Sequence, residues 1–242
     1  MIIFRRKFSP GWLVTIITIA GCVLFFSLGL WQLERAAYKD SIEQKFETRL
    51  EGGYVRMNIR LALADIEFRK LELHGNYDQH RTILVDNQLH HGRAGYHVLS
   101  PFELSDSEDI VLVNRGWIAV GNSRERLPPI EPPAMSGIAR GIASIPGEDP
   151  FRMGQVSLQD TWPQLVPFID IESMQEKFDG QLLPLILWLG PEQAGHYARE
   201  WNPVWLKPEK SRAYAWQWFT FGALSLILFL VLNLRNENEN EK

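Results

Sequence analysis

The chain has 242 residues, of which 45% are hydrophobic and 22% charged, and its formal net charge is -4 at pH 7. This length accommodates one domain and two membrane helices, but hardly two domains. The sequence shows no basic field of the kind that nucleic acid binding requires, so we expect no nucleic-acid partner. The only cysteine, Cys22, lies inside an apolar run, which excludes an internal disulfide and a thiolate metal site.

An apolar run without charge from Trp12 to Trp31 predicts the first transmembrane helix. At about 1.5 Å per residue it is long enough to cross a hydrocarbon core of about 30 Å. Basic residues at positions 5–7 precede the run, which assigns residues 1–11 to the cytoplasm. A cleaved signal peptide is the alternative, because Ile19 to Cys22 resembles a lipoprotein cleavage site. The apolar run continues past this cysteine, which favours an uncleaved anchor.

Apolar residues then recur at helical spacing, which predicts that the first helix continues as an amphipathic stalk over residues 32–50. The apolar stripe consists of Trp31, Tyr38, Ile42, Phe46 and Leu50. Three polar residues, Gln32, Arg35 and Lys39, share another face of this helix. Two interpretations remain open for them: they snorkel to lipid headgroups, or they form a docking face for the domain or for a partner helix.

From Phe68 the hydrophobic period changes to two, which predicts an antiparallel β meander. The expected strands are 68–73, 82–85, 96–99 and 110–113, with turns at Gly75-Asn76, at Gly92-Arg93 and at residues 105–107. The glycine in Arg115-Gly116-Trp117 indicates a bulge or a close backbone approach after the most apolar strand.

The second half of the domain is less periodic. We expect a stiff irregular connection at Leu127 to Pro133, a strand within residues 136–145 and a short helix at 169–178 that starts at Asp170. The apolar run 182–189 is too short to span a membrane and predicts a buried strand. The residues from Trp201 to Lys210 lead to the second span.

A second uncharged run, from Tyr214 to Leu234, predicts a transmembrane helix over residues 213–234. It returns the chain to the cytoplasm, where residues 235–242 form an acidic tail, and both termini are then cytoplasmic. Residues 32–212 become a single extracytoplasmic domain. We therefore predict an α+β membrane protein in which two transmembrane helices, in contact with the lipid bilayer, flank one mainly antiparallel-β domain.

The histidines His90, His91 and His97 raise the question of a metal site. Adjacent residues on a strand point to opposite faces, and no carboxylate stands at ligand spacing in the sequence. A solvated hairpin, with turns at Asp86-Asn87 and at Gly92, is the favoured interpretation, and we predict no metal site.

The segment Asn114 to Trp117 is the best polar cluster in a strand context. Arg115 either binds an anion such as a propionate bidentately, or pairs with an acid of the fold while Trp117 packs the core. The second interpretation is favoured. Hydrolase, nucleotide-binding and redox signatures are missing from the sequence, and no nucleophile can be paired with a base. We therefore predict that the protein is not an enzyme and has no catalytic residue.

Aromatic residues mark the entrance to the second span: Tyr214, Trp216 and Trp218, with Gln217 among them. Such residues usually form an interfacial belt. They are also candidate walls for a haem, although no histidine lies in or beside either span to ligate its iron.

Four motifs, in order between the two spans, resemble the surfeit-locus-one (Shy-like) family of cytochrome c oxidase assembly factors. The motifs are Leu28 to Arg35 with Lys39, His74 to Tyr77, Val111 to Trp117, and Pro208 to Lys210 followed by Tyr214 to Phe219. The resemblance implies structural or interaction roles for their members Trp31, Gln32, Arg35, Lys39, Gly75, Tyr77, Asn114, Arg115, Gly116, Trp117 and Gln217.

The resemblance implies a non-enzymatic factor that helps mature the haem a-containing catalytic subunit of the oxidase, its main partner. Haem a handling, with contacts from Tyr214, Trp216 and Trp218, is the alternative function, and the haem a synthesis machinery is a further expected partner. The family's proposed haem-ligating histidine is Ser211 here, and a hydroxyl is a poor axial ligand, which favours scaffolding. We expect the protein in the bacterial inner membrane, with its domain in the periplasm.

Overall fold

The computed structural model describes residues 6–8, 10–57, 63–121, 126–133, 137–146, 156–195, 197–200 and 207–236. The chain divides into two compact units, Met1–Gln44 with Pro203–Lys242, and Lys45–Asn202. The predictions that concern Arg5, Ser136, Trp201 to Trp205 and the tail beyond residue 236 lie outside the described residues.

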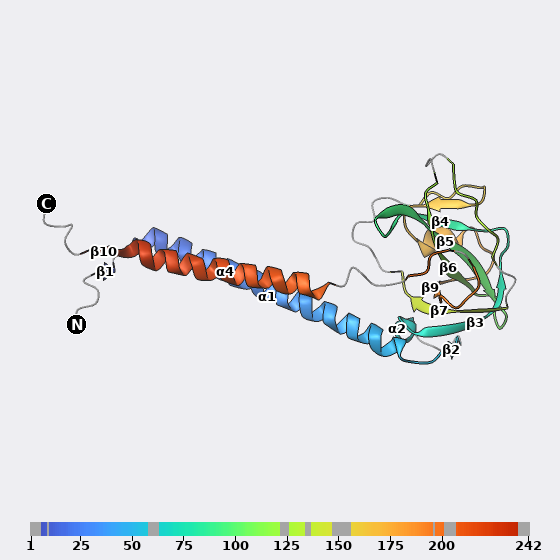
Figure 1. Ribbon diagram of the computed structural model, residues 1–242, viewed down its shortest axis with the longest axis horizontal. Helices are drawn as coiled ribbons and strands as arrows, with labels where there is room; N and C mark the ends of the chain where they lie inside the picture. Colours follow the sequence, from blue (N-terminus) through green and yellow to red (C-terminus); the bar gives the residue numbers. More distant parts are fainter. Residues whose placement is uncertain are drawn as a thin grey trace. The chain divides into compact units, whose positions relative to one another are not determined.

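Two long helices form most of the first unit (Figure 1). They are α1 (Trp12–Leu50, 39 residues) and α4 (Pro208–Asn233, 26 residues), and both are long and apolar enough to cross a membrane. Helix α1 is unbroken to Leu50, as the helical spacing predicts, and its last turn and a half belongs to the second unit. Helix α4 begins at Pro208, earlier than the expected residue 213, because proline suits the first helical turn, where its missing N–H needs no partner.

A short antiparallel pairing of β1 (Arg6–Phe8) with β10 (Leu234–Asn236) joins the ends of this unit. The sequence pattern does not predict these strands, because three residues are too few to establish a period.

A closed β-barrel forms the centre of the second unit (Figure 1). A short helix α2 (Leu63–Ile66) precedes β3, and the strands are β2 (Val55–Arg56), β3 (Lys70–Tyr77), β4 (Ile83–His90), β5 (Arg93–Leu104), β6 (Ile110–Ala119), β7 (Ile138–Ser144), β8 (Gln164–Val166) and β9 (Leu182–Leu189). Their order is β2-β3-β7-β9-β6-β5-β4-β8, and an additional pairing of β3 with β5 closes the ring β3-β7-β9-β6-β5. The predicted α+β class is confirmed.

The predicted meander is right for β4, β5 and β6, which are antiparallel neighbours, and wrong for β3. Residues 70–74 of β3 pair with β7, and only residues 75–77 pair with β5. Gly75-Asn76, expected as a turn, is therefore a point inside a strand where the strand changes partner. Three pairings are parallel, β2–β3, β4–β8 and β6–β9. Hydrophobic alternation does not reveal them, because it reports which face is buried and not which strand is the neighbour.

The expected turn at Asp86-Asn87 is also wrong, because both residues lie inside β4. The β4–β5 register shifts between Val85 and Gln88, and Asn87 has a φ of 59°. These two observations identify a β-bulge, which asparagine tolerates well.

Apolar side chains cover both faces of the barrel wall. The interior holds a cluster that includes Leu71, Leu73, Phe102, Val111, Val113, Leu185 and Leu187. Alternate residues of β6 and β9, such as Leu112 and Ile186, belong instead to a cluster on the outer face. The sequences of strands β6 and β9 are nearly continuous apolar runs because these strands are buried on both faces.

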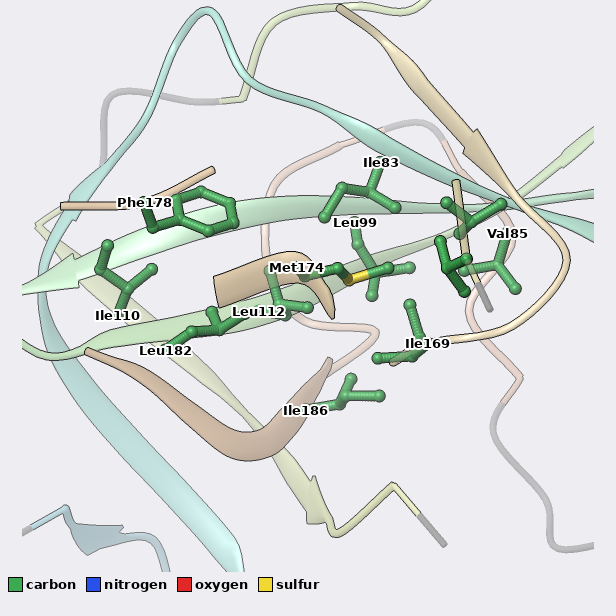
Figure 2. Packing of buried hydrophobic residues seen from close by; sticks show 12 residues of the cluster. Ile83, Val85, Leu99, Ile110, Leu112, Ile169, Met174, Phe178, Leu182 and Ile186 are labelled. Carbon is green, nitrogen blue, oxygen red and sulfur yellow. The ribbon is translucent and has the colours of Figure 1, made fainter. Parts of the chain in front are cut away.

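The outer cluster is completed by α3 (Ile171–Gln175), whose Met174 packs near Ile83, Leu99 and Leu112 (Figure 2). The predicted start of this helix is confirmed, since the Asp170 side chain accepts a hydrogen bond from the backbone N–H of Ser173. The predicted strands at 136–145 and 182–189 correspond to β7 and β9. Residues 127–133 have no regular structure, as their prolines predict.

Candidate functional site

The Arg115 motif lies at a bulge in the barrel wall. Val98 of β5 pairs with Gly116, and Leu99 pairs with Asn114, so Arg115 is an extra residue opposite no partner on β5. Gly116 has a φ of 125°, and its N–H donates to Asn114 Oδ1 at 2.9 Å. The bulge that this glycine predicts is confirmed. A bulge redirects the side chain of the extra residue, and here that residue is Arg115.

The Arg115 guanidinium fastens the proline-rich connection to the barrel. Arg115 is only 7% exposed. Its Nη2 donates to the carbonyl oxygens of Glu131, at 2.8 Å, and Pro132, at 3.1 Å, and its Nη1 donates to Ser100 Oγ at 3.3 Å. The Tyr197 ring centre lies 5.2 Å from the guanidinium carbon. These hydrogen bonds are to backbone carbonyls and a hydroxyl, and within the described part of the chain Glu131 is the one carboxylate whose charge acts on the Arg115 guanidinium, as a minor influence that raises its pKa.

A cavity of about 270 Å³ lies beside Arg115. Tyr77, at the end of β3, also lines it and packs edge-on against Phe102, with 4.8 Å between ring centroids. Burial raises the pKa of Tyr77 to about 12 and is the main cause that lowers the pKa of Arg115. The barrel thus brings two motifs from different strands, Gly75 to Tyr77 and Asn114 to Trp117, to one cavity. Its volume lies below the usual range of about 300–1,000 Å³ for ligand pockets, so it suits a small group.

Trp117 packs on the barrel, as expected. Its indole Nε1 donates to the carbonyl oxygen of Gln88 at 2.9 Å, and its ring centre lies 4.9 Å from that of His90. Both contacts are with β4, so Trp117 links β6 to a strand that is not its neighbour in the sheet.

His97 does not join the other two histidines of the hairpin. Its ring packs edge-on against Trp188 of β9, with 5.0 Å between centroids. Within the described residues its Nδ1 has no hydrogen-bond partner. Burial is the main cause that lowers the pKa of His97 to about 4.

We expect acid to destabilise the fold through His97. The unfolded histidine has a pKa of 6.5 and the folded one about 4, so the unfolded state binds more protons between these values. Stability is therefore fully present above about pH 6.5 and falls toward pH 4, by a total on the order of 3 kcal/mol. Unfolding free energies measured against pH should show a flatter acid limb for His97→Gln. The matched change His80→Gln, at an exposed position, should keep the wild-type slope. An equal acid limb in all three proteins would show that His97 is not responsible.

The two helices of the first unit pack through small residues and aromatic rings. A Cβ on Gly29 would lie 2.4 Å from the ring of Phe219, and one on Gly222 would lie 3.1 Å from the ring of Phe26. The residues buried along this seam are Gly29, Gln32 and Ala36 of α1 and Pro208, Ser211, Ala215 and Gly222 of α4. Small residues let helices approach closely in lipid, where apolar burial does not drive their association.

Polar contacts lie at one end of the seam. Lys39 Nζ donates to the buried Ser211 Oγ at 3.3 Å, and Arg212 Nη2 lies 2.6 Å from Asp40 Oδ2. Ser211 is therefore a link between the two helices.

The three polar residues of the first motif do not act as one face. Gln32 is buried, and Lys39 donates a hydrogen bond to Ser211 of α4. Arg35 is exposed, and its guanidinium carbon lies 5.6 Å from the ring centre of Trp31. The apolar stripe is exposed at its start, at Trp31 and Tyr38, whereas Phe46 farther along packs edge-on against Phe68, with 5.6 Å between ring centroids.

The aromatic residues of α4 do not form a single wall. Trp218 stacks on Phe25, with 6.0 Å between centroids, whereas Trp216 is 71% exposed and Tyr214 and Gln217 are exposed. Residues two apart lie about 200° apart around a helix, so Trp216 faces away from the other two aromatic residues.

The two long helices lack the side chains that most often ligate a haem iron. Neither α1 nor α4 contains a histidine or a methionine. The Ser211 hydroxyl already accepts a hydrogen bond from Lys39. A hydroxyl in this environment is a poor axial ligand beside the imidazoles and thioethers that usually hold haem iron.

The structure adds Tyr197 and Arg199 to the Arg115 site. Tyr197 Oη accepts from the backbone N–H of Glu131 at 2.9 Å. Arg199 donates to the carbonyl oxygen of Arg115 at 2.8 Å and to that of Ala194 at 2.8 Å. The sequence does not mark either residue, because their partners are backbone groups of distant segments.

A model of the SURF1 family matches residues 19–223. A SURF1-like protein of Drosophila melanogaster is 28% identical over 134 residues, which cover 48% of this chain and 43% of that protein. A SURF1-like protein of Dictyostelium discoideum is 32% identical over 107 residues, covering 40% of this chain and 39% of that protein. The cytochrome oxidase assembly protein SHY1 of Saccharomyces cerevisiae is 29% identical over 119 residues, covering 48% and 31%. The chain thus spans less than half the length of these relatives in the matched segments.

Proposed function

Because this chain belongs to the SURF1 family, we propose that it is an assembly factor for haem-copper cytochrome c oxidase. The yeast relative is a cytochrome oxidase assembly protein, which supports this role. In the proposal the protein assists maturation of the haem a-containing catalytic subunit and catalyses no reaction itself. The catalytic subunit is the main partner, and the haem a synthesis machinery is a second one.

In the proposed arrangement the protein lies in the bacterial inner membrane. The two apolar helices cross the bilayer as residues 12–31 and 213–234, and residues 32–212 lie in the periplasm. The basic residues that precede the first span favour cytoplasmic termini. Exposed side chains of the helix pair, among them Trp31, Trp216 and Gln217, are then available to a helix of the oxidase subunit.

The observation that carries the proposal is the convergence of two family motifs at the Arg115 cavity. Nη1 and Nη2 of Arg115 are bound to acceptors of the fold itself, and its backbone carbonyl is bound by Arg199. These bonds hold the connection at residues 127–133, which forms part of the cavity rim, in a fixed shape. A fixed shape serves recognition of a partner, because rigid elements lose little conformational entropy on binding.

Haem a carriage is the alternative function, with Tyr214, Trp216 and Trp218 as contacts. It requires an iron ligand other than a histidine or a methionine of the two spans, since neither span contains one. Protein purified from cells that make haem a distinguishes the two functions: a bound chromophore supports carriage, and a colourless preparation supports scaffolding.

We expect loss of the protein to remove haem a from respiratory membranes selectively. The measurement is the reduced-minus-oxidised optical spectrum, together with cytochrome c oxidase activity, of membranes from a strain that lacks this chain. The haem a signal and the activity should fall severalfold while b-type and c-type haems persist, because only one client fails to mature. Re-expression of the wild-type chain is the control and should restore both signals. Unchanged haem a and activity would refute the proposed client.

A further inference from the structure

Three side chains that metals commonly bind come together on the second unit, and none of them lines the Arg115 cavity. Ligand atoms of His90, His91 and Glu200 all lie within 4.8 Å of one another. His91 Nε2 is 3.1 Å from Glu200 Oε2, and the centroids of the two imidazoles are 4.3 Å apart. The expectation that the two histidines point to opposite faces is therefore wrong.

The turn between β4 and β5 explains why the two imidazoles meet. His90 pairs with Arg93 across the turn, and the two residues between them have positive φ angles, 48° at His91 and 76° at Gly92. Two central residues with positive φ are the mark of a type I′ hairpin turn. His91 thus leaves the extended conformation in which successive side chains alternate between faces.

Trp117 supports the cluster from two directions. Its ring packs on His90, at 4.9 Å between centroids, and is itself held by the hydrogen bond of Nε1 to Gln88. Its backbone N–H and carbonyl pair with Ala198, at 2.8 and 3.1 Å, which brings the segment that carries Glu200 beside the hairpin. The sheet and a backbone bridge therefore bring the hairpin and the Glu200 segment side by side, independently of the contact between His91 and Glu200.

The contact of His91 with Glu200 contributes little to holding this arrangement. Their side chains are 72% and 65% exposed, and exposed pairs contribute little to stability. One metal ion bound by all three side chains would link the β4–β5 hairpin to the segment that carries Glu200.

We propose that His90, His91 and Glu200 bind a divalent transition-metal ion of the Zn²⁺ class. Two imidazoles and one carboxylate are a donor set that suits Zn²⁺, whereas Mg²⁺ and Ca²⁺ require oxygen ligands. Three protein ligands leave a position of a tetrahedral ion for water or for a ligand from a partner. The site goes beyond the proposed assembly role, which does not depend on it.

The test titrates Zn²⁺ into the full chain, purified in detergent without a histidine tag and stripped with a chelator, by isothermal titration calorimetry. We expect one Zn²⁺ per chain, and His91→Ala or Glu200→Gln should weaken binding at least about tenfold. Both changes are at exposed side chains, so the fold should persist, which the far-UV circular dichroism spectrum checks. The matched change His80→Ala removes an exposed histidine elsewhere and should leave the affinity unchanged.

Two results would overturn the site: no binding by the wild-type chain at micromolar Zn²⁺, or equal affinity in wild type, His91→Ala and Glu200→Gln. Co²⁺ gives an independent readout, because its visible absorption depends on ligand geometry. The wild-type chain with Co²⁺ should show a spectrum that His91→Ala loses and His80→Ala keeps, and a spectrum common to all three proteins places the ion elsewhere.

Discussion

Replacement of Gly75 by alanine is expected to lower the free energy of unfolding of the second unit by about 3 kcal/mol or more. A Cβ at this position would lie 1.9 Å from the carbonyl oxygen of Glu103 and 2.8 Å from the ring of Phe102. The first of these atoms is backbone, so relief requires the two strands to separate. They are β3 and β5, whose pairing at residues 75–77 closes the barrel.

The measurement is denaturant unfolding of the full chain in detergent, together with hydrogen–deuterium exchange on peptides from β3 and β5. Exchange should increase first at the closing pairing, Gly75 with Leu104 and Tyr77 with Phe102. Gly137→Ala is the matched control, because its Cβ would meet only the carbonyl oxygen of Gly75, at 3.8 Å. Equal stability of Gly75→Ala and Gly137→Ala would mean that the close approach of Gly75 to Glu103 is not needed to close the barrel.

Replacement of Arg115 by methionine should cost about 2 to 4 kcal/mol of unfolding free energy. Methionine is similar in length but donates no hydrogen bond, so the carbonyl oxygens of Glu131 and Pro132 lose their shared donor. Arg115→Lys keeps the charge but loses the planar fork, so its effect should be intermediate. The exposed Arg93 is the control position, and Arg93→Met should change stability by less than about 0.5 kcal/mol.

The Arg115 variants also link the fold to the proposed function. Hydrogen–deuterium exchange should rise across residues 126–133 in Arg115→Met, because the guanidinium no longer fastens this connection. In the strain that lacks the protein, Arg115→Met should restore less of the haem a signal than Arg93→Met at equal protein levels. If Arg115→Met restored the haem a signal fully although residues 126–133 exchanged faster, a fixed shape of this connection would not be needed for the assembly role.

Several parts of the molecule are determined by the sequence itself. The two long helices follow from uninterrupted apolar runs, and α3 follows from the Asp170 cap. The bulge at Arg115 follows from the glycine after it, whose φ of 125° other residues rarely adopt. Each of these signals is local: length, capping and backbone freedom act within a few residues, so one stretch of chain contains all the information.

Only the tertiary structure decided which distant segments meet. Barrel closure depends on β3 leaving β7 for β5 at Gly75, and the acceptors of Arg115 are carbonyl oxygens that any residue would offer. The cluster of His90, His91 and Glu200 likewise depends on a turn and on a backbone bridge at Trp117. Backbone carbonyl groups are the same at every position, and so are N–H groups outside proline, so they leave no mark in a sequence. Which backbone groups bond to one another is therefore known only from the tertiary structure, where the packed strands bring them within hydrogen-bond distance.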